Sequence, residues 1–211
     1  MKNPVVVAGH KLLSFKLAYN SYQTIVGGVA YRNRFVKESV SSAGSILDLG
    51  CGTGVVAKKL KENQAYTGID SSDRYVEAAR GIVTPCKNFN VIAGDVARKD
   101  WGKSLGSEVF DSALALGLLH HIDDSGVSNL LDGLRPFIQS GGFLFSVDPV
   151  ITESSSRVAR WFAENDRGKF VRNPRELELL FKRSGYKTNI TIKQREFRIP
   201  LDTIEIVATS S

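Results

Sequence analysis

The stretch that most constrains this chain is Ile-Leu-Asp-Leu-Gly-Cys-Gly-Thr-Gly, at residues 46–54. It opens with side chains typical of a buried strand and then places a glycine at every second position, at Gly50, Gly52 and Gly54. A chain uses glycine where φ must be positive or where a ligand lies directly against the main chain. The stretch therefore predicts a buried strand that ends in a ligand-binding loop.

Strand-like and helix-like segments alternate along the rest of the chain. We expect further strands over 65–70, 90–96, 109–119 and 143–150, and helices over 53–63, 71–83, 125–138, 155–163 and 174–184. Segments 188–193 and 203–209 alternate apolar with polar residues and predict an antiparallel pair. This order is typical of the α/β class. It predicts a Rossmann-like doubly wound sheet, mostly parallel with an antiparallel C-terminal strand, and helices on both faces.

The length of 211 residues fits a single domain with a substantial core. Within it we expect an N-terminal helical lid over residues 1–45, a cofactor-binding core over 46–150, and substrate-side helices with a C-terminal hairpin over 151–211. In a parallel sheet of this kind, ligands bind at the carboxyl ends of the strands. The glycine loop lies at such an end.

Composition excludes several classes of protein. An apolar fraction of 42% and a charged fraction of 24% are those of a globular chain. We find no apolar run long enough for a membrane span and no signal-peptide core, so a cytoplasmic location is expected. Two cysteines indicate neither a disulfide framework nor a metal site. The net charge of +6 resides at the two ends of the chain, either as solvated helix faces or as a surface for an anionic substrate, a lipid surface or RNA.

Acidic residues narrow the choice of ligand. Asp70 ends the second strand, 20 residues after Gly50, where a carboxylate can bind both hydroxyls of a ribose. Asp95 ends the third strand. The nicotinamide fingerprint G-x-G-x-x-G needs a third glycine at position 55, which is Val55 here. The pattern disfavours a nicotinamide enzyme.

Five segments follow one another in the order and at the spacing of one known family: "ILDLGCGTG", "YTGID", "VIAGDV", "FDSALALGLLHHI" and "LRPFIQSGGFLFSVD". They extend over about residues 46–148. Through these segments the chain resembles the class I S-adenosylmethionine-dependent methyltransferases of the small-molecule type. The resemblance implies S-adenosyl-L-methionine as cofactor, and transfer of its methyl group to an oxygen or nitrogen of a small-molecule or lipid-like acceptor. It does not identify the acceptor, and the oligomeric state stays open.

The resemblance also implies a role for each matching residue. The backbone at Gly50 and Gly52 would approach the methionine portion, Asp70 would hold the ribose, and Leu116 with Gly117 would lie beneath the sulfonium. The cofactor site so implied consists of Asp48, Gly50, Cys51, Gly52, Gly54, Asp70, Ser71, Asp95, Val96, Leu116, Gly117, Tyr22 and Gln23. Structural alternatives are that Asp48 ties the loop to its neighbours, that Asp95 caps the next turn and that Cys51 only packs.

Two groups of residues are candidates for the acceptor side. His120 or His121 can act as a general base, oriented by Asp123 or Asp124, or the pair can simply cap a loop. Further along the chain, arginines and aromatic residues are interleaved. We expect Arg167, Arg172 and Trp161 to bind the acceptor, the arginines through a carboxylate or phosphate; alternatively, the arginines staple a surface turn.

Two rival functions remain from the sequence. The basic ends favour an RNA methyltransferase, whereas a protein that binds the cofactor without catalysis would carry the same motifs. Methylation of DNA amino groups is disfavoured, because the fourth strand continues into Leu-Gly-Leu-Leu-His-His rather than an Asn/Asp-Pro-Pro-aromatic stretch. Nucleic acid is therefore a possible but not a favoured partner.

Overall fold

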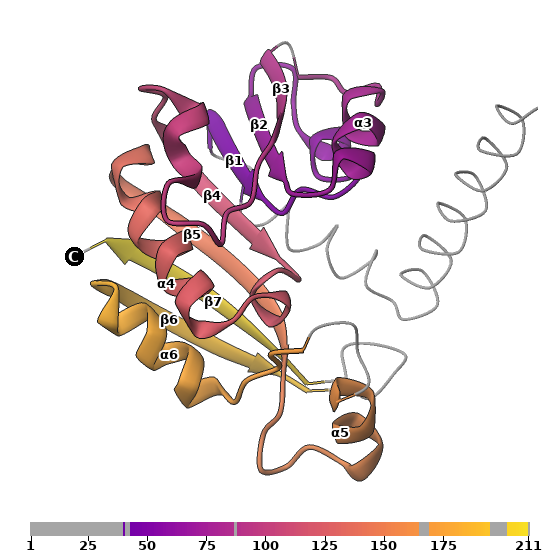
Figure 1. The fold of residues 1–211 in the computed structure, drawn as a ribbon, viewed down its shortest axis with the longest axis vertical. Coiled ribbons are helices and arrows are strands. Elements are labelled where there is room, and N and C mark those ends of the chain that lie inside the picture. The colour runs from indigo at the N-terminus through magenta and orange to yellow at the C-terminus, as the bar shows by residue number, and fades with distance from the viewer. Residues whose placement is uncertain (1–39, 41–42, 87, 165–168, 195–201, 211) are drawn as a thin grey trace, which may run out of the picture.

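The computed structural model describes residues 40, 43–86, 88–164, 169–194 and 202–210. These residues form a seven-stranded sheet with strand order β3-β2-β1-β4-β5-β7-β6 (Figure 1). The strands are β1 Ser45–Leu49, β2 Ala65–Asp70, β3 Asn88–Ala93, β4 Phe110–Leu116, β5 Ile138–Val150, β6 Tyr186–Lys193 and β7 Asp202–Ser210. Neighbours pair in parallel from β3 to β5, and β7 is antiparallel to both β5 and β6. The predicted fold class is confirmed.

Helices cover both faces of the sheet, as Figure 1 shows. They are α3 Asp73–Arg80, α4 Asp124–Leu134, α5 Arg157–Glu164 and α6 Pro174–Arg183, with short 3₁₀ turns η1 Ala57–Lys59, η2 Trp101–Leu105, η3 Leu119–His121 and η4 Arg135–Phe137. Alternate residues of β1 face the two cores. Ile46 packs in the cluster that contains Val76 of α3, while Leu47 packs in the cluster that contains Leu130 of α4 and Leu177 of α6.

Polar residues just before three helices explain where those helices begin. The Ser72 hydroxyl accepts a hydrogen bond from the Tyr75 amide at the start of α3, and the Asp123 carboxylate accepts one from the Gly126 amide at the start of α4. Asn173 forms a full capping box with Glu176 ahead of α6. Each bond satisfies an amide that the helix itself leaves without a partner.

The prediction of an α-helix over 53–63 is wrong. The chain forms turns there and only the 3₁₀ turn η1. Gly54 has φ of +71°, which no residue inside a right-handed helix adopts. The β-branched residues Val55 and Val56 follow it and further disfavour helix. What remains of the segment is too short to be helical on its own.

Parallel pairing aligns the ends of four strands at one edge of the sheet. The register places Asp48 of β1 opposite Gly68 of β2, and Asp70 of β2 opposite Ala93 of β3. Most of the predicted lid over 1–45 lies outside the described residues. No helix of the described ranges is both long and apolar enough to cross a membrane.

Candidate active site

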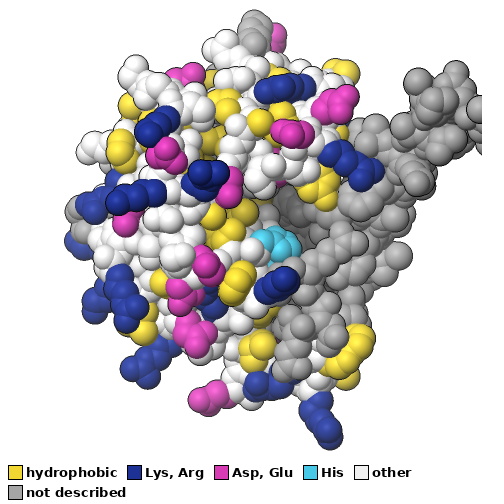
Figure 2. All heavy atoms as spheres, viewed as in Figure 1, with side chains coloured by type: hydrophobic (Ala, Val, Ile, Leu, Met, Phe, Trp, Pro, Cys, Tyr) yellow, Lys and Arg dark blue, Asp and Glu magenta, His cyan; other side chains and the backbone are white. Residues whose placement is uncertain are grey.

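A cavity of about 390 Å³ opens at the carboxyl ends of β1, β2 and β4 and over the turn after β3. Figure 2 shows this face hollowed beside a histidine side chain. Eleven residues that were predicted for the site line it: Asp48, Gly50, Cys51, Gly52, Asp70, Ser71, Asp95, Val96, Leu116, Gly117 and His121. Ile69, which directly precedes Asp70, lines it too. The structure thus brings together side chains from four separate strand ends.

The glycine loop adopts left-handed backbone at Gly50, Gly52 and Gly54, with φ of +68°, +56° and +71°. A Cβ on Gly50 would lie only 2.8 Å from Cδ1 of Leu118, whereas a Cβ on Gly52 would meet no atom within 4 Å. Gly52 therefore presents bare backbone to the cavity. Gly54 does not line it. Its missing side chain lets the loop pack on Ala79 and Ile82, and its contact with the cofactor stays a prediction.

Asp70 connects the glycine loop to the start of α3. Its Oδ2 accepts a hydrogen bond from the Gly52 amide at 2.8 Å, and its Oδ1 accepts one from the Ser72 amide at 2.9 Å. These bonds hold the carboxylate in one orientation on the cavity wall. Each carboxylate oxygen retains a second lone pair for a ligand hydroxyl.

Asp48 and Asp95 contribute two further carboxylates with different surroundings. Asp48 is only 2% exposed, and its Oδ2 accepts a hydrogen bond from the Tyr66 hydroxyl at 2.7 Å. Asp95 is exposed, and its Oδ1 accepts a hydrogen bond from the Ala97 amide at 3.0 Å. Asp95 thus makes the turn contact of the structural alternative, while both carboxylates line the cavity.

The Cys51 thiol is a neutral part of the wall. Burial raises its pKa far above the ordinary value, and the negative charges of Asp48 and Asp70 raise it further. A thiol that keeps its proton is a poor nucleophile. Both Cys51 and Cys86 are free and buried.

The two histidines of the β4–α4 loop occupy different environments. His120 is 7% exposed, with its Nδ1 at 2.7 Å from Oδ1 of Asp148, which also accepts the His120 amide at 3.1 Å. His121 is exposed and lines the cavity, with its ring centroid 4.0 Å from that of His120. The carboxylate that holds the His120 ring is Asp148 of β5, where Asp123 or Asp124 had been expected.

The two aspartates that were expected to orient a histidine have other partners. Hydrogen bonds from the Gly126 amide and the Ser125 hydroxyl lower the pKa of Asp123 at the start of α4. Asp124 forms an ion pair with Arg172 at 2.8 Å. Asp123 is thus engaged within the first turn of α4, whereas Asp124 is engaged by a residue 48 positions further along the chain.

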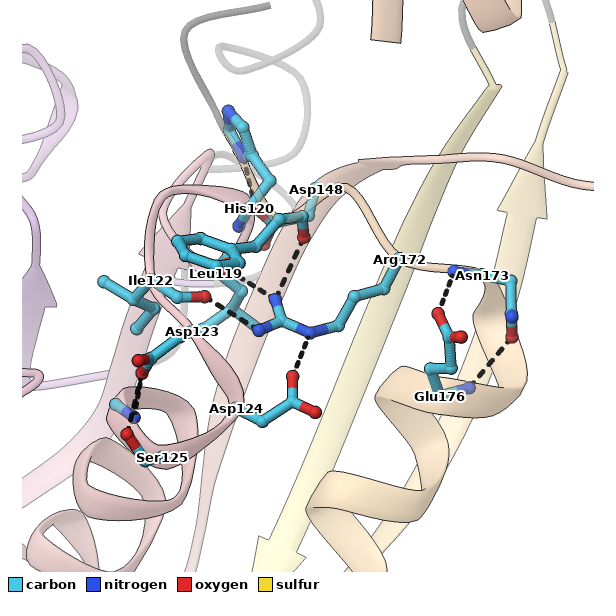
Figure 3. Close-up of polar contacts among 12 residues, drawn as sticks. Leu119, His120, Ile122, Asp123, Asp124, Ser125, Asp148, Arg172, Asn173 and Glu176 are labelled. Carbon is cyan, nitrogen blue, oxygen red and sulfur yellow. Dashed lines mark hydrogen bonds and ion pairs between the residues drawn. The ribbon is translucent and has the colours of Figure 1, made fainter. Parts of the chain in front are cut away.

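Arg172 does not face the cavity, so the prediction that it binds the acceptor is corrected. Its side chain is 6% exposed, and Figure 3 shows the guanidinium enclosed by the loop that leads into α4. It donates to the carbonyls of Leu119 at 2.8 Å, Ile122 at 2.8 Å and Phe170 at 3.1 Å, besides Asp124. Arg172 thereby ties segment 169–172 to the loop that carries the histidines.

Trp161 was predicted to bind the acceptor but is not among the residues that line the described cavity. Trp161 lies on α5 with 58% of its surface exposed. Arg167, Tyr22 and Gln23 lie outside the described residues. For these three, the sequence-based roles stay predictions.

Sequence reasoning missed the two buried residues that hold predicted groups in place, Tyr66 and Asp148. Tyr66 lies four residues before Asp70, on the same face of β2, and Asp148 lies near the end of the buried run in β5. The signal in the sequence that could have identified them was a polar residue within an otherwise apolar strand. Other residues in the cavity wall that were not predicted are Thr53, Val55, Val56, Ser72, Tyr75, Gly94, Leu118 and Ile122.

Comparison with known proteins decides the family. A family model described as a methyltransferase domain matches residues 29–190, more than half of the chain. The chain belongs to the methyltransferase-domain family. Its resemblance to the S-adenosylmethionine-dependent methyltransferases is thereby confirmed. A search of curated protein sequences found no match.

Solved structures of methyltransferases share the fold at low sequence identity. Human N-acetylserotonin methyltransferase in complex with SAM is 18% identical, with a TM-score of 0.69, 96% of this chain covered and 56% of that chain. CalO1, a methyltransferase in calicheamicin biosynthesis in its SAH-bound form, is 16% identical, with a TM-score of 0.70 and coverages of 93% and 57%. This chain therefore spans little more than half the length of either protein.

A methyltransferase from Archaeoglobus fulgidus is closer in size. It is described as SAM-dependent, is 17% identical with a TM-score of 0.68, and is covered over 99% of its length by 90% of this chain. The shared architecture therefore does not require the additional segments of the longer proteins.

The cavity residues of this chain suit S-adenosylmethionine, the cofactor of the family. Three carboxylates, of Asp48, Asp70 and Asp95, surround a glycine loop with bare backbone, and apolar side chains such as Ile69 and Val96 lie between them. Such a set matches a cationic amino acid, a ribose diol and an adenine. The described residues contain no His, Cys, Asp and Glu cluster suited to a metal ion.

Proposed function

We propose that this chain is an S-adenosylmethionine-dependent methyltransferase that methylates an oxygen or nitrogen of a small-molecule or lipid-like acceptor. The observation that carries the proposal is the cavity in which Asp48, Asp70 and Asp95 meet the glycine loop on one side and His121 on the other. Family membership supports the reaction. The names of two similar structures, which refer to N-acetylserotonin and to calicheamicin biosynthesis, support the class of acceptor.

The carboxylates would bind and orient the cofactor. Asp70 would accept hydrogen bonds from the ribose hydroxyls while it holds the Gly52 and Ser72 amides. Asp48 would provide the negative charge opposite the cationic amino group. Asp95 would accept from the adenine amino group, and Val96 would pack on the ring.

When bound, S-adenosylmethionine supplies an electrophilic methyl group on a sulfonium. Transfer needs an acceptor held in line with that group and little else from the protein. A hydroxyl acceptor must also lose a proton. His121, on the cavity wall, would take that proton, and the neighbouring His120–Asp148 pair would fix the position of the loop.

The direct test measures S-adenosylhomocysteine binding by titration calorimetry and then methyl transfer. Purified protein receives methyl-labelled S-adenosylmethionine and fractionated cell extract, and label is followed into organic-soluble, small aqueous, RNA and protein fractions. We expect label in the organic-soluble or small aqueous fraction, and loss of that label in Asp70→Ala. Absence of cofactor binding would overturn the proposal.

The same assay separates the two rival functions. Label in RNA would favour an RNA methyltransferase and make the basic ends of the chain its binding surface. Cofactor binding with no label in any fraction would favour a protein that binds the cofactor without catalysis. Either result would replace the proposed acceptor class.

A further inference from the structure

Tyr66 is a buried polar side chain that no part of the proposed mechanism uses. It is 1% exposed, and its hydroxyl donates to Oδ2 of Asp48 at 2.7 Å. A buried tyrosine hydroxyl needs a partner, but a backbone carbonyl is the usual choice. Here the partner is the carboxylate that lines the cavity.

The sheet brings these two side chains together across a glycine. Asp48 of β1 pairs with Gly68 of β2, and Tyr66 lies two residues before Gly68 on the same face. A Cβ on Gly68 would lie 2.9 Å from Sγ of Cys51 and 3.0 Å from Cε1 of Tyr66. The absence of a side chain at Gly68 therefore leaves the space that the phenol and the thiol occupy beside Asp48.

The phenol ring itself is held in place. It stacks on Phe89 of β3 with centroids 5.6 Å apart and planes 13° apart. Its hydroxyl thus reaches Asp48 from a fixed ring, so the bond restricts the carboxylate to one orientation. The cluster is close-packed rather than adjustable.

The phenol of Tyr66 and the thiol of Cys51, which both lie beside Asp48, keep their protons. Burial, together with the charge of Asp48, raises the pKa of Tyr66 well above its ordinary value. The Cys51 thiol also keeps its proton, for the same two reasons and because of the charge of Asp70. The phenol is therefore a permanent donor, which stabilises the Asp48 carboxylate but cannot neutralise it. A buried carboxylate beside a cavity favours a cationic ligand group.

We propose that Tyr66 is a positioning residue that orients the Asp48 carboxylate and thereby gives the cavity its preference for ligands with a cationic amino group. The inference rests on the proposed function, since S-adenosylmethionine and S-adenosylhomocysteine carry that group. 5′-Methylthioadenosine shares their adenosine and thioether but lacks the amino acid portion. The ratio of its dissociation constant to that of S-adenosylhomocysteine therefore measures how much the Asp48 side of the cavity contributes to binding the amino acid portion.

The experiment measures both dissociation constants by titration calorimetry for the wild type, Tyr66→Phe and Tyr186→Phe. Tyr186 is the matched control, because its buried hydroxyl donates to the Leu131 carbonyl at 2.9 Å and lies outside the cavity wall. We expect Tyr66→Phe to raise the dissociation constant of S-adenosylhomocysteine about tenfold, as for loss of a hydrogen bond to a charged group. The dissociation constant of 5′-methylthioadenosine should stay within about twofold of the wild-type value. Tyr186→Phe should change neither affinity.

A double-mutant cycle separates the orientation of Asp48 from a general effect of Tyr66→Phe on the fold. Asp48→Asn should raise the dissociation constant of S-adenosylhomocysteine. Adding Tyr66→Phe to that variant should raise it by less than about a further twofold, because the charge that the phenol orients is gone. An equal loss of affinity for both ligands in Tyr66→Phe, or full additivity with Asp48→Asn, would overturn the role of Tyr66 but not the proposed function. A wild type that binds neither ligand would overturn the proposed function as well.

Discussion

On the β1–β3 side of the cavity, the polar groups come from strand ends and from the loops that follow them. Asp48 and Asp70 are such residues, and the glycine loop begins directly after β1. On the β4–β5 side, the loop that carries His121 is held by residues far along the chain, Asp148 and Arg172. The groups proposed to bind the cofactor are thus local to their strands, whereas the loop proposed to face the acceptor depends on long-range contacts.

This difference suggests how the two sides respond to change. A substitution on the β1–β3 side removes a group that is proposed to contact the ligand itself. A substitution on the β4–β5 side at Arg172 or Asp148 acts through the position of a loop. The first kind should alter affinity, and the second should alter stability and the rate of transfer.

Asp70→Ala should produce the largest effect on the β1–β3 side. The change would remove the two charge-assisted hydrogen bonds proposed for the ribose, and it releases the Gly52 and Ser72 amides. We expect the S-adenosylhomocysteine dissociation constant to rise roughly a thousandfold, as measured by titration calorimetry. A rise of less than about tenfold would place the ribose elsewhere.

Arg172→Met should produce the largest loss of stability on the β4–β5 side. It leaves the Leu119, Ile122 and Phe170 carbonyls without their donor. We expect the free energy of unfolding in urea to fall by about 3 kcal/mol. Arg175→Met, at an exposed position of α6, is the control and should stay near wild type. Equal effects of the two changes would contradict the role of Arg172 as a staple.

His121→Ala tests whether the acceptor-side loop serves chemistry. With the acceptor fraction identified, we expect the rate of methyl transfer to fall about a hundredfold, because the proposed general base is removed. Affinity for S-adenosylhomocysteine should change much less, since the carboxylates of the other side are intact. An unchanged rate would show that the acceptor reacts without a base from this loop.

At high pH, the ionisation of two buried tyrosines, Tyr186 of β6 and Tyr66 of β2, should lower the free energy of unfolding. Burial raises the pKa of Tyr186 from 10.0 to about 12, so between those values the unfolded chain releases its proton before the folded one. Stability that is present below pH 10 should therefore decline toward pH 12, by about 2 kcal/mol from this residue. Urea unfolding at pH 9, 10 and 11 should show a shallower decline in Tyr186→Phe, with Tyr66 accounting for part of the rest. An identical slope would contradict the shift.

Asp124→Asn should have the smallest effect. Its carboxylate pairs with Arg172, but the Asp124 side chain is 74% exposed, and such pairs contribute less than about 1 kcal/mol. The three carbonyl contacts of Arg172 remain. A loss in urea unfolding as large as that of Arg172→Met would mean that the ion pair, rather than the carbonyl contacts, holds the loop.

Prediction from sequence succeeded for structural features that depend on one short segment of the chain. The strand Ala65–Asp70 was predicted with its exact bounds, and Asp70 was expected at its end. The helix expected after the glycine loop did not form, because the left-handed Gly54 precedes two valines. The start of α5 was also expected two residues early, at Ser155, whose hydroxyl instead contacts Asp202 of the distant strand β7.

The orienting partners of the histidines show why the rest was not predictable. Asp123 and Asp124 were nearest in sequence to His120, but both are engaged at the start of α4. Asp148 is 28 residues from His120 and meets it because β5 pairs with β4. Arg172, which resembled an anion ligand beside aromatic residues, is buried by contacts with a loop about 50 residues away.

The sequence by itself determined the order of the strands and of most helices along the chain, the glycine loop and the carboxylates at the strand ends. Each of these depends on a few neighbouring residues and on the direction of a strand. Only the tertiary structure decided which side chains hold those groups in place. Tyr66 meets Asp48 across Gly68, and Arg172 closes around the histidine loop. Both depend on strand register and on packing between distant segments, which no short stretch of sequence encodes.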